Sequence, residues 1–138
     1  MRTILSLPAV VWIVGIAGLM WSGCPAQGAD RWTALSLIES GDNDRAVGPQ
    51  GEVSRYQMQP ELWKQYARTN ADWTKPEDSL EVAKAVMQER CAAFERSSNR
   101  PPTDFEFYVL WNAPAQIPRP SKAVARRAER FCNVINSP

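Results

Sequence analysis

The sequence has no histidine among its 138 residues. This absence excludes Ser-His-Asp and Cys-His nucleophilic mechanisms, as well as zinc sites with histidine ligands. Asp42-Asn43-Asp44 begins like a calcium-binding loop, but Val47 and Val53 stand where that loop needs its glycine and its bidentate glutamate. We therefore expect no metal and no organic cofactor. Acid–base chemistry in this chain then falls to carboxylates and amines.

The chain also lacks a strong net charge. Its formal net charge is +1, and the 16 basic side chains less Arg2 equal the 15 acidic ones. This balance gives no electrostatic basis for a nucleic-acid partner.

Long hydrophobic runs are rare. One stretch, Ile4 to Met20, follows Arg2 and precedes small residues near 26–29. The pattern predicts a secretory signal peptide over residues 1–29, with no stable membrane span after cleavage and a periplasmic or secreted location in a bacterium. A retained membrane anchor is the alternative. Lipidation of Cys24 is a less favoured route, because Trp21 is unsuited to the first position of a lipobox.

Cysteine is scarce as well. The chain has 3 cysteines, and removal of the signal region leaves Cys91 and Cys132. Two cysteines in an exported domain most simply form one disulfide. Both lie on apolar faces of predicted helices, so we expect the Cys91–Cys132 bond to join the longest helix to the last one. A pair of buried thiols is the alternative.

The remaining chain, residues 30–138, reads as one mainly α domain. Helices are expected over about 30–40, from Pro60 to about Asn70, from a capping box at Thr74-Lys75-Pro76-Glu77 to about Arg96, from a second capping box at Thr103 through Trp111, and after Ser121. Apolar residues at helical spacing form the predicted core. A short hairpin near 53–58 is the only β structure we expect.

Glu39 is the strongest candidate for chemistry. Trp32, Leu35 and Glu39 have i, i+3, i+7 spacing, so they share one helix face. A carboxyl group on an apolar face is partly desolvated, which raises its pKa and suits it to act as a general acid. A glutamate at a helix C-terminus is also disfavoured by the helix dipole, so a purely structural role explains it less well.

The segment after Glu39 resembles the soluble-type lytic transglycosylases of the lysozyme-like superfamily. Glu39-Ser40 resembles the Glu-Ser element that ends their catalytic helix. Gly48-Pro49-Gln50-Gly51 is similar to their Gly-x-x-Gly element, and Tyr56-Gln57-Met58-Gln59-Pro60 to their Met-Gln-Ile-x-Pro-like segment. Leu110-Trp111-Asn112-Ala113-Pro114 occupies the place of their Tyr-Asn-Ala-Gly-like motif, with Trp111 where tyrosine is usual.

This resemblance implies a small goose-type or transglycosylase-like helical domain whose substrate is the glycan strand of peptidoglycan. Glu39 would protonate the β-1,4 bond between N-acetylmuramic acid and N-acetylglucosamine and then act as base on the muramoyl 6-hydroxyl, giving a 1,6-anhydro product. The resemblance also implies a sugar cleft formed by residues at the matching positions. These are Ser40, Tyr56, Gln57, Trp111 and Asn112.

Two other activities stay open. A hydrolytic muramidase would need a second carboxylate to hold water, and Asp42, Asp44 and Glu52 are the candidates. A catalytically silent peptidoglycan-binding protein is the other, because Trp111 and Pro114 depart from the family's pattern. We expect a monomer in each case. The last segment is basic, and we expect its basic side chains to form a solvated helix face, with contact to acidic wall peptides as the alternative. These residues are Arg119, Lys122, Arg126, Arg127 and Arg130.

Overall fold

The computed structural model describes residues 29–138, and within them the fold is helical. The predicted signal peptide, including Cys24, lies outside these residues. The exception is Ala29, the last residue of the predicted signal peptide. The elements run in the order α1 (Arg31–Ser40), α2 (Pro60–Tyr66), α3 (Pro76–Ser98), α4 (Asp104–Asn112), the 3-10 turn η1 (Pro114–Gln116) and α5 (Lys122–Asn136). None of these helices has the length and apolar character needed to cross a bilayer.

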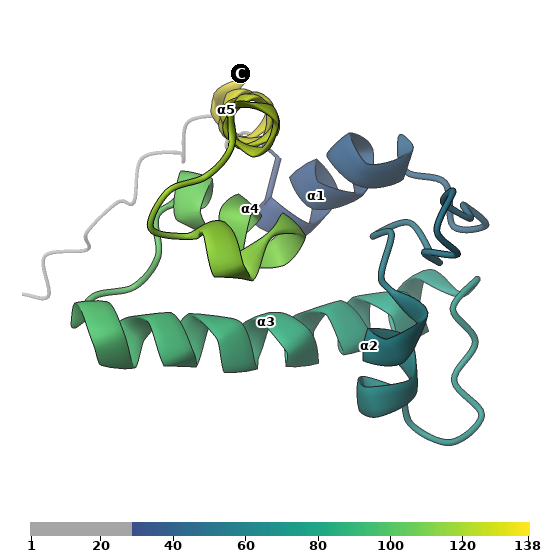
Figure 1. The fold of residues 1–138 in the computed structure, drawn as a ribbon. Helices are drawn as coiled ribbons and strands as arrows, with labels where there is room; N and C mark the ends of the chain where they lie inside the picture. The colour runs from purple at the N-terminus through teal and green to yellow at the C-terminus, as the bar shows by residue number, and fades with distance from the viewer. Residues whose placement is uncertain (1–28) are drawn as a thin grey trace, which may run out of the picture.

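Helix α4 forms the centre of the domain. It packs against α3 on one side and α5 on the other, and α1 contacts α5 (Figure 1). Its five residues Phe107 to Trp111 are all buried. Rings from α4 and α5 meet in this core: Phe107 stacks on Phe131 at 5.9 Å between centroids, and Tyr108 lies 5.4 Å from the same ring. This aromatic packing sets α5 against α4.

Local sequence signals set most of the helix ends. Asp30 caps α1 by accepting from the backbone N–H groups of Trp32 and Thr33, and Gly41 ends the helix with φ 66°. The capping box at Thr103 and Glu106 forms as predicted, with both reciprocal hydrogen bonds.

The predicted capping box at Thr74 does not form. The N-cap of α3 is Lys75, which makes no side-chain capping bond. Thr74 instead donates its hydroxyl to Asp72 at 2.7 Å. The backbone N–H of Asp72 in turn bonds to the buried carboxylate of Asp78 at 2.8 Å. Because Asp78 ties the preceding loop to the first turn of α3, the helix begins with Pro76 at its first position.

The expected hairpin is reduced to one bridge. Val53 and Met58 exchange backbone hydrogen bonds of 2.8 and 2.9 Å, and Val53 also bridges Val47, but no strand is present in residues 29–138. Ser54 and Gln57 have φ of 70° and 49°, so the chain reverses direction within four residues. The segment is a tight loop that projects side chains in several directions.

The predicted disulfide is not formed. Cys91 and Cys132 are both free thiols, each half-buried. Cys91 belongs to α3 and Cys132 to α5, and α4 packs between these two helices (Figure 1). The apolar faces of α3 and α5 therefore both point toward the core but do not meet each other. Burial raises the pKa of both thiols.

Candidate functional site

Glu39 lies in the last turn of α1, one helical turn beyond the fully buried Leu35. Its side chain retains 6% of its exposure, so the carboxyl group is almost entirely removed from solvent. Gly41 ends the helix immediately afterwards and directs the chain into the 41–59 loop. The predicted placement of Glu39 on the core-facing side of α1 is confirmed.

Two other helices supply hydrogen-bond donors to this carboxylate. The Tyr108 hydroxyl, from α4, donates to Oε1 of Glu39 at 2.6 Å. Nη2 of Arg127, from α5, donates to Oε2 at 3.0 Å. The Arg127 guanidinium also lies 6.0 Å from the centroid of the Tyr108 ring. Both oxygens of Glu39 therefore have a partner, one neutral and one charged.

The pKa of Glu39 is raised above its ordinary value. Burial is the largest cause, and the nearby negative charge of Glu52 adds to it, whereas the bonds from Tyr108 and Arg127 act in the opposite direction. The pKa of Tyr108 is strongly raised by its own burial and by the charge of Glu39. The Tyr108 hydroxyl therefore stays protonated near neutral pH and can donate to Glu39.

Glu39 forms part of the wall of a cavity of about 520 Å³. This volume lies within the range of small-ligand sites. Residues from five parts of the chain line it: the end of α1, the 49–59 loop with α2, Arg90 of α3, the end of α4 with the following Pro114, and α5. Those with polar or aromatic groups that could contact a ligand include Glu39, Glu52, Gln57, Trp111, Asn112 and Arg127.

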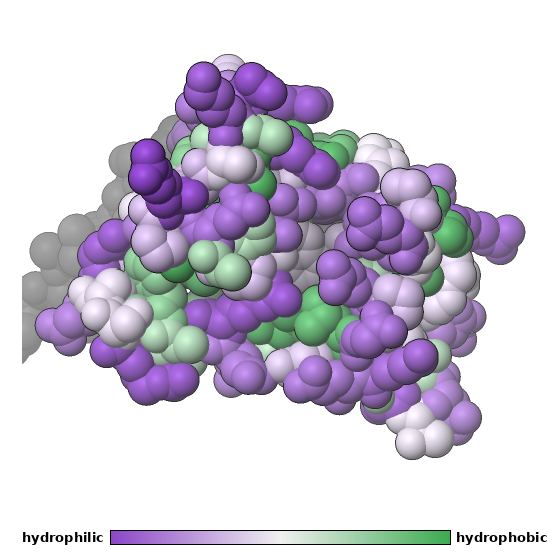
Figure 2. Space-filling view, viewed as in Figure 1, coloured by the Kyte–Doolittle hydropathy of each residue, from purple (hydrophilic) through white to green (hydrophobic). Residues whose placement is uncertain are grey.

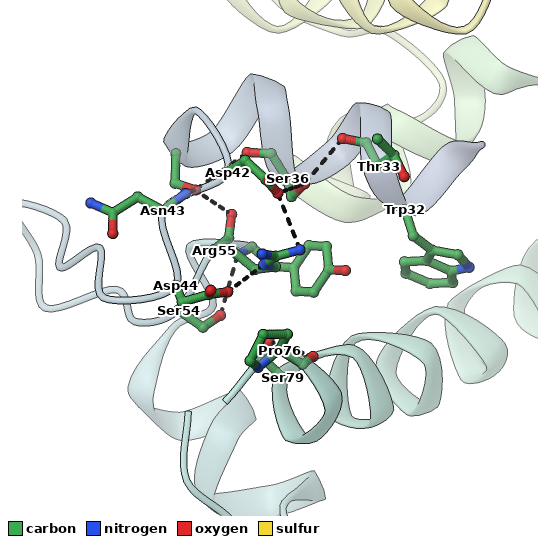
Figure 3. Close-up of polar contacts among 12 residues, drawn as sticks. Trp32, Thr33, Ser36, Asp42, Asn43, Asp44, Ser54, Arg55, Pro76 and Ser79 are labelled. Atoms are coloured by element: carbon green, nitrogen blue, oxygen red, sulfur yellow. Dashed lines mark hydrogen bonds and ion pairs between the residues drawn. The ribbon is translucent and has the colours of Figure 1, made fainter. Parts of the chain in front are cut away.

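An ion-pair network holds the first part of the loop. Arg55 pairs with Asp44 at 2.5 Å and with Asp42 at 3.1 Å, and the Ser36 hydroxyl donates to Asp42 at 2.8 Å (Figure 3). The Ser40 hydroxyl donates to the backbone carbonyl of Arg55 at 2.8 Å. Asp42 and Asp44 are therefore both paired with Arg55, and neither lines the cavity.

Glu52 is the one of the three candidate second carboxylates that reaches the cavity. Gly48 makes this possible. A β-carbon at Gly48 would lie 2.3 Å from Oε2 of Glu52 and 2.6 Å from Oε1 of Gln57, closer than any side-chain contact permits. Gln57 donates its amide N–H to the carbonyl of Ser54 at 3.1 Å, which leaves Oε1 free to accept. Two acceptor oxygens thus converge beside Gly48.

The predicted sugar-binding residues divide into two groups. Gln57, Trp111 and Asn112 line the cavity as expected. Ser40 does not, since its hydroxyl bonds to the loop backbone.

Tyr56, which was expected among the residues of the sugar cleft, does not line the cavity. Its ring is 2% exposed and lies edge-on between Trp32 and Trp111, 6.3 Å from the centroid of each. The tight turn at Ser54 directs this ring into the core, where it packs against Trp111.

Tyr108 and Arg127 are functional candidates that the motifs in the sequence do not identify. Tyr108 belongs to the expected aromatic helix, and it precedes Trp111 by three residues and so shares its helix face. The prediction that Arg127 belongs to a solvated face is wrong, because its guanidinium bonds to a buried carboxylate. Its spacing of three from Val124 and four from Phe131 places it at the edge of the buried face of α5, and this spacing is a signal that could have identified it.

Arg90, on α3, lines the cavity and bonds to the end of α4. Its Nη1 donates to the backbone carbonyls of Leu110 and Trp111 at 2.8 and 2.7 Å. These carbonyls lie in the last turn of α4, where a cation is favoured by the helix dipole. Arg90 therefore fixes the end of α4 that carries Trp111 and Asn112.

Within residues 29–138, no three acidic or cysteine side chains converge as metal ligands. Comparison with protein-family models, curated proteins and solved structures finds no match for this chain.

Proposed function

We propose that this protein cleaves the β-1,4 bond between N-acetylmuramic acid and N-acetylglucosamine in peptidoglycan, with Glu39 as the acid–base catalyst. The observation that carries the proposal is a single buried carboxyl group on the wall of a polar cavity, bound by a tyrosine from one helix and an arginine from another. Burial raises its pKa, which favours the protonated form that a general acid needs. The sequence resemblance to lytic transglycosylases supplies the substrate.

The reaction would proceed in two proton transfers. Glu39 gives its proton to the glycosidic oxygen as the bond from that oxygen to the muramoyl C1 breaks. The Glu39 carboxylate then takes the proton of the muramoyl 6-hydroxyl, whose oxygen bonds to C1 and closes the 1,6-anhydro ring. The proton returns to the residue that gave it, so the reaction needs no second carboxylate and consumes no water.

Other cavity residues suit a sugar substrate. The amides of Gln57 and Asn112 offer both donors and acceptors to N-acetyl and hydroxyl groups. Trp111, which is 8% exposed, contributes an apolar ring edge to the wall. The Tyr108 hydroxyl bonds Glu39 and restricts its rotamers.

Hydrolysis is the second candidate, and Glu52 favours it. This carboxylate lines the same cavity as Glu39 and lies beside the acceptor oxygen of Gln57. A water molecule that donates to both oxygens would be positioned for attack, with Glu52 as base. The product then carries a reducing end in place of the anhydro ring.

Digestion of purified peptidoglycan by the exported protein and by Glu39→Gln tests the proposal. A general acid contributes on the order of 10² to 10⁴-fold, so we expect muropeptide release to fall by at least that lower figure. Glu95→Gln, an exposed glutamate on α3, is the matched control and should retain full activity. Product mass separates the two reactions, since the anhydro product is lighter by one water.

Equal release by wild type and Glu39→Gln would refute the catalytic role of Glu39. Binding to sacculi with no release by wild type would instead indicate a protein that only binds the wall.

A further inference from the structure

Both carboxyl oxygens of Glu39 accept a hydrogen bond. Oε1 accepts from Tyr108 and Oε2 accepts from Arg127, so a donor already faces each oxygen. The adjacent guanidinium of Arg127 also favours the ionised carboxylate over the acid. A general acid needs the opposite: a protonated oxygen directed at the glycosidic oxygen. Release of the charged partner would therefore favour proton donation by Glu39.

Arg127 is the partner able to leave. Its side chain is 42% exposed, whereas Tyr108 is fully buried against Phe131. Only one of the N–H groups of the guanidinium bonds to Glu39, and Arg127 lines the cavity, so its remaining donors are available to a ligand there. A guanidinium released from Glu39 keeps its charge at all relevant pH values, so an anionic group in the cavity can bind it.

The surface near Arg127 is suited to an anionic ligand. Helix α5 carries four basic residues, Lys122, Arg126, Arg127 and Arg130, against one acidic residue, Glu129. Arg130 lies one turn along the helix from Arg127 and is exposed. Figure 2 shows hydrophilic side chains gathered over the part of the molecule where α5 lies in Figure 1. Positive charge of this kind attracts a carboxylate-bearing ligand toward α5.

We propose that Arg127 exchanges Glu39 for a carboxylate of the peptide attached to the muramoyl residue, so that strands bearing acidic peptides are the preferred substrate. The inference rests on the proposed function and specifies its substrate class. Arg127 is then a positioning residue: it stabilises the ionised form of Glu39 at rest and releases Glu39 when an acidic peptide enters the cavity. Bidentate binding of a carboxylate is the geometry that a guanidinium favours.

The exchange changes the protonation of Glu39 in a defined direction. The charged or titratable groups that act on Glu39 are Tyr108 from α4, Arg127 from α5 and Glu52 from the loop. Arg90, from α3, lines the same cavity. When Arg127 leaves, only the Tyr108 hydrogen bond still opposes the effects of burial and of the Glu52 charge, and the pKa of Glu39 rises. Substrate binding thus favours the protonated form of Glu39 that donates to the glycosidic oxygen.

The kinetic test compares two substrates: soluble glycan strands with their peptides, and the same strands after the peptide carboxylates have been coupled to an amine as neutral amides. For wild type we expect kcat/KM to be about tenfold higher on the strands with free peptide carboxylates, equivalent to about 1.4 kcal/mol. Arg127→Gln should lose this preference, and its pH–rate profile should move to higher pH because the pKa of Glu39 rises. Arg130→Gln, the matched control, should keep the substrate preference and the pH–rate profile of wild type. Equal rates of wild type on both substrates, or an unchanged preference in Arg127→Gln, would overturn the exchange.

A second measurement does not depend on turnover. The side-chain carboxyl resonance of Glu39, labelled with carbon-13 and assigned by its loss in Glu39→Gln, is titrated with and without N-acetylmuramoyl dipeptide. We expect the dipeptide to raise the pKa of Glu39 in wild type and not in Arg127→Gln, and uncharged N-acetylglucosamine to leave it unchanged. Absence of muropeptide release from either substrate would count against the proposed function alone. An unmoved Glu39 resonance at saturating dipeptide would count against the exchange.

Discussion

Replacing Tyr108 with phenylalanine removes one hydroxyl group and leaves the ring in place. Tyr108 is fully buried and packs on Phe131, so the phenyl ring of the variant retains the apolar contacts. What is lost is the 2.6 Å hydrogen bond to Oε1 of Glu39. Since the Glu39 side chain is only 6% exposed, water cannot readily replace the missing donor.

The size of the effect follows from the charge on Glu39. A hydrogen bond to a charged group contributes about 1.5–3 kcal/mol, and one between neutral groups about 0.5–1.5 kcal/mol. The ionised form of Glu39 therefore loses about 1–1.5 kcal/mol more than the protonated form. At about 1.36 kcal/mol per pKa unit, the pKa of Glu39 should rise by about one unit in Tyr108→Phe.

The same shift predicts how stability depends on pH. The folded-state pKa of Glu39 is raised, so the stability gained by binding its proton is fully present below the unfolded value, about 4.3. That stability is lost as pH rises through the folded pKa. Because Tyr108→Phe raises the folded pKa further, its loss is larger at high pH: the deficit relative to wild type should be about 1–1.5 kcal/mol greater at about pH 8 than at about pH 4.

Urea unfolding at the two pH values measures this deficit, and a carbon-13 titration of Glu39 measures the pKa directly. Tyr66→Phe is the matched control. Tyr66 also donates its hydroxyl to a glutamate, Glu89, but this pair is exposed and does not line the cavity. An equal deficit at the two pH values, or a lowered pKa of Glu39 in Tyr108→Phe, would refute the role of the Tyr108 hydroxyl as a donor to the ionised carboxylate.

Two further predictions concern the loop and the thiols. Gly48→Ala should displace Glu52 and Gln57 and reduce peptidoglycan cleavage, because its β-carbon would lie 2.3 Å from Oε2 of Glu52 and 2.6 Å from Oε1 of Gln57, a proposed sugar contact. Gly41→Ala strains a residue with φ 66° in open space, so it should lower stability without that loss of activity. Full activity of Gly48→Ala would contradict the proposed sugar contact of Gln57. Alkylation of the unfolded protein without reductant, followed by peptide mapping, should modify both Cys91 and Cys132, and unmodified peptides that become reactive only after reduction would show a disulfide instead.

The helices and the face that carries Glu39 were accessible from short stretches of sequence. Asp30 and Gly41 delimit α1 through hydrogen bonds and a backbone conformation that involve only neighbouring residues. The spacing of Trp32, Leu35 and Glu39 depends only on the helical period. Each of these signals acts over a few residues, which is why the pattern of residue types suffices to read them.

The partners of Glu39 were not accessible in this way. Tyr108 follows Glu39 by 69 residues in the sequence, and Arg127 follows Glu39 by 88 residues. Their meeting depends on how α4 and α5 pack, and that packing is decided by aromatic rings whose pairing no local pattern specifies. The same holds for Cys91 and Cys132: apolar periodicity predicted that both face the core, but not that α4 lies between their helices.

Local sequence thus placed a carboxyl group at the end of an apolar helix face and a glycine-bearing loop after it, because helical periodicity and capping act over one or two turns. Tertiary packing alone decided what that carboxyl group contacts: Tyr108 on one oxygen and Arg127 on the other. It also decided that Glu52, rather than Asp42 or Asp44, lines the same cavity. Burial and charge set the pKa of Glu39, and both are properties of the assembled helices.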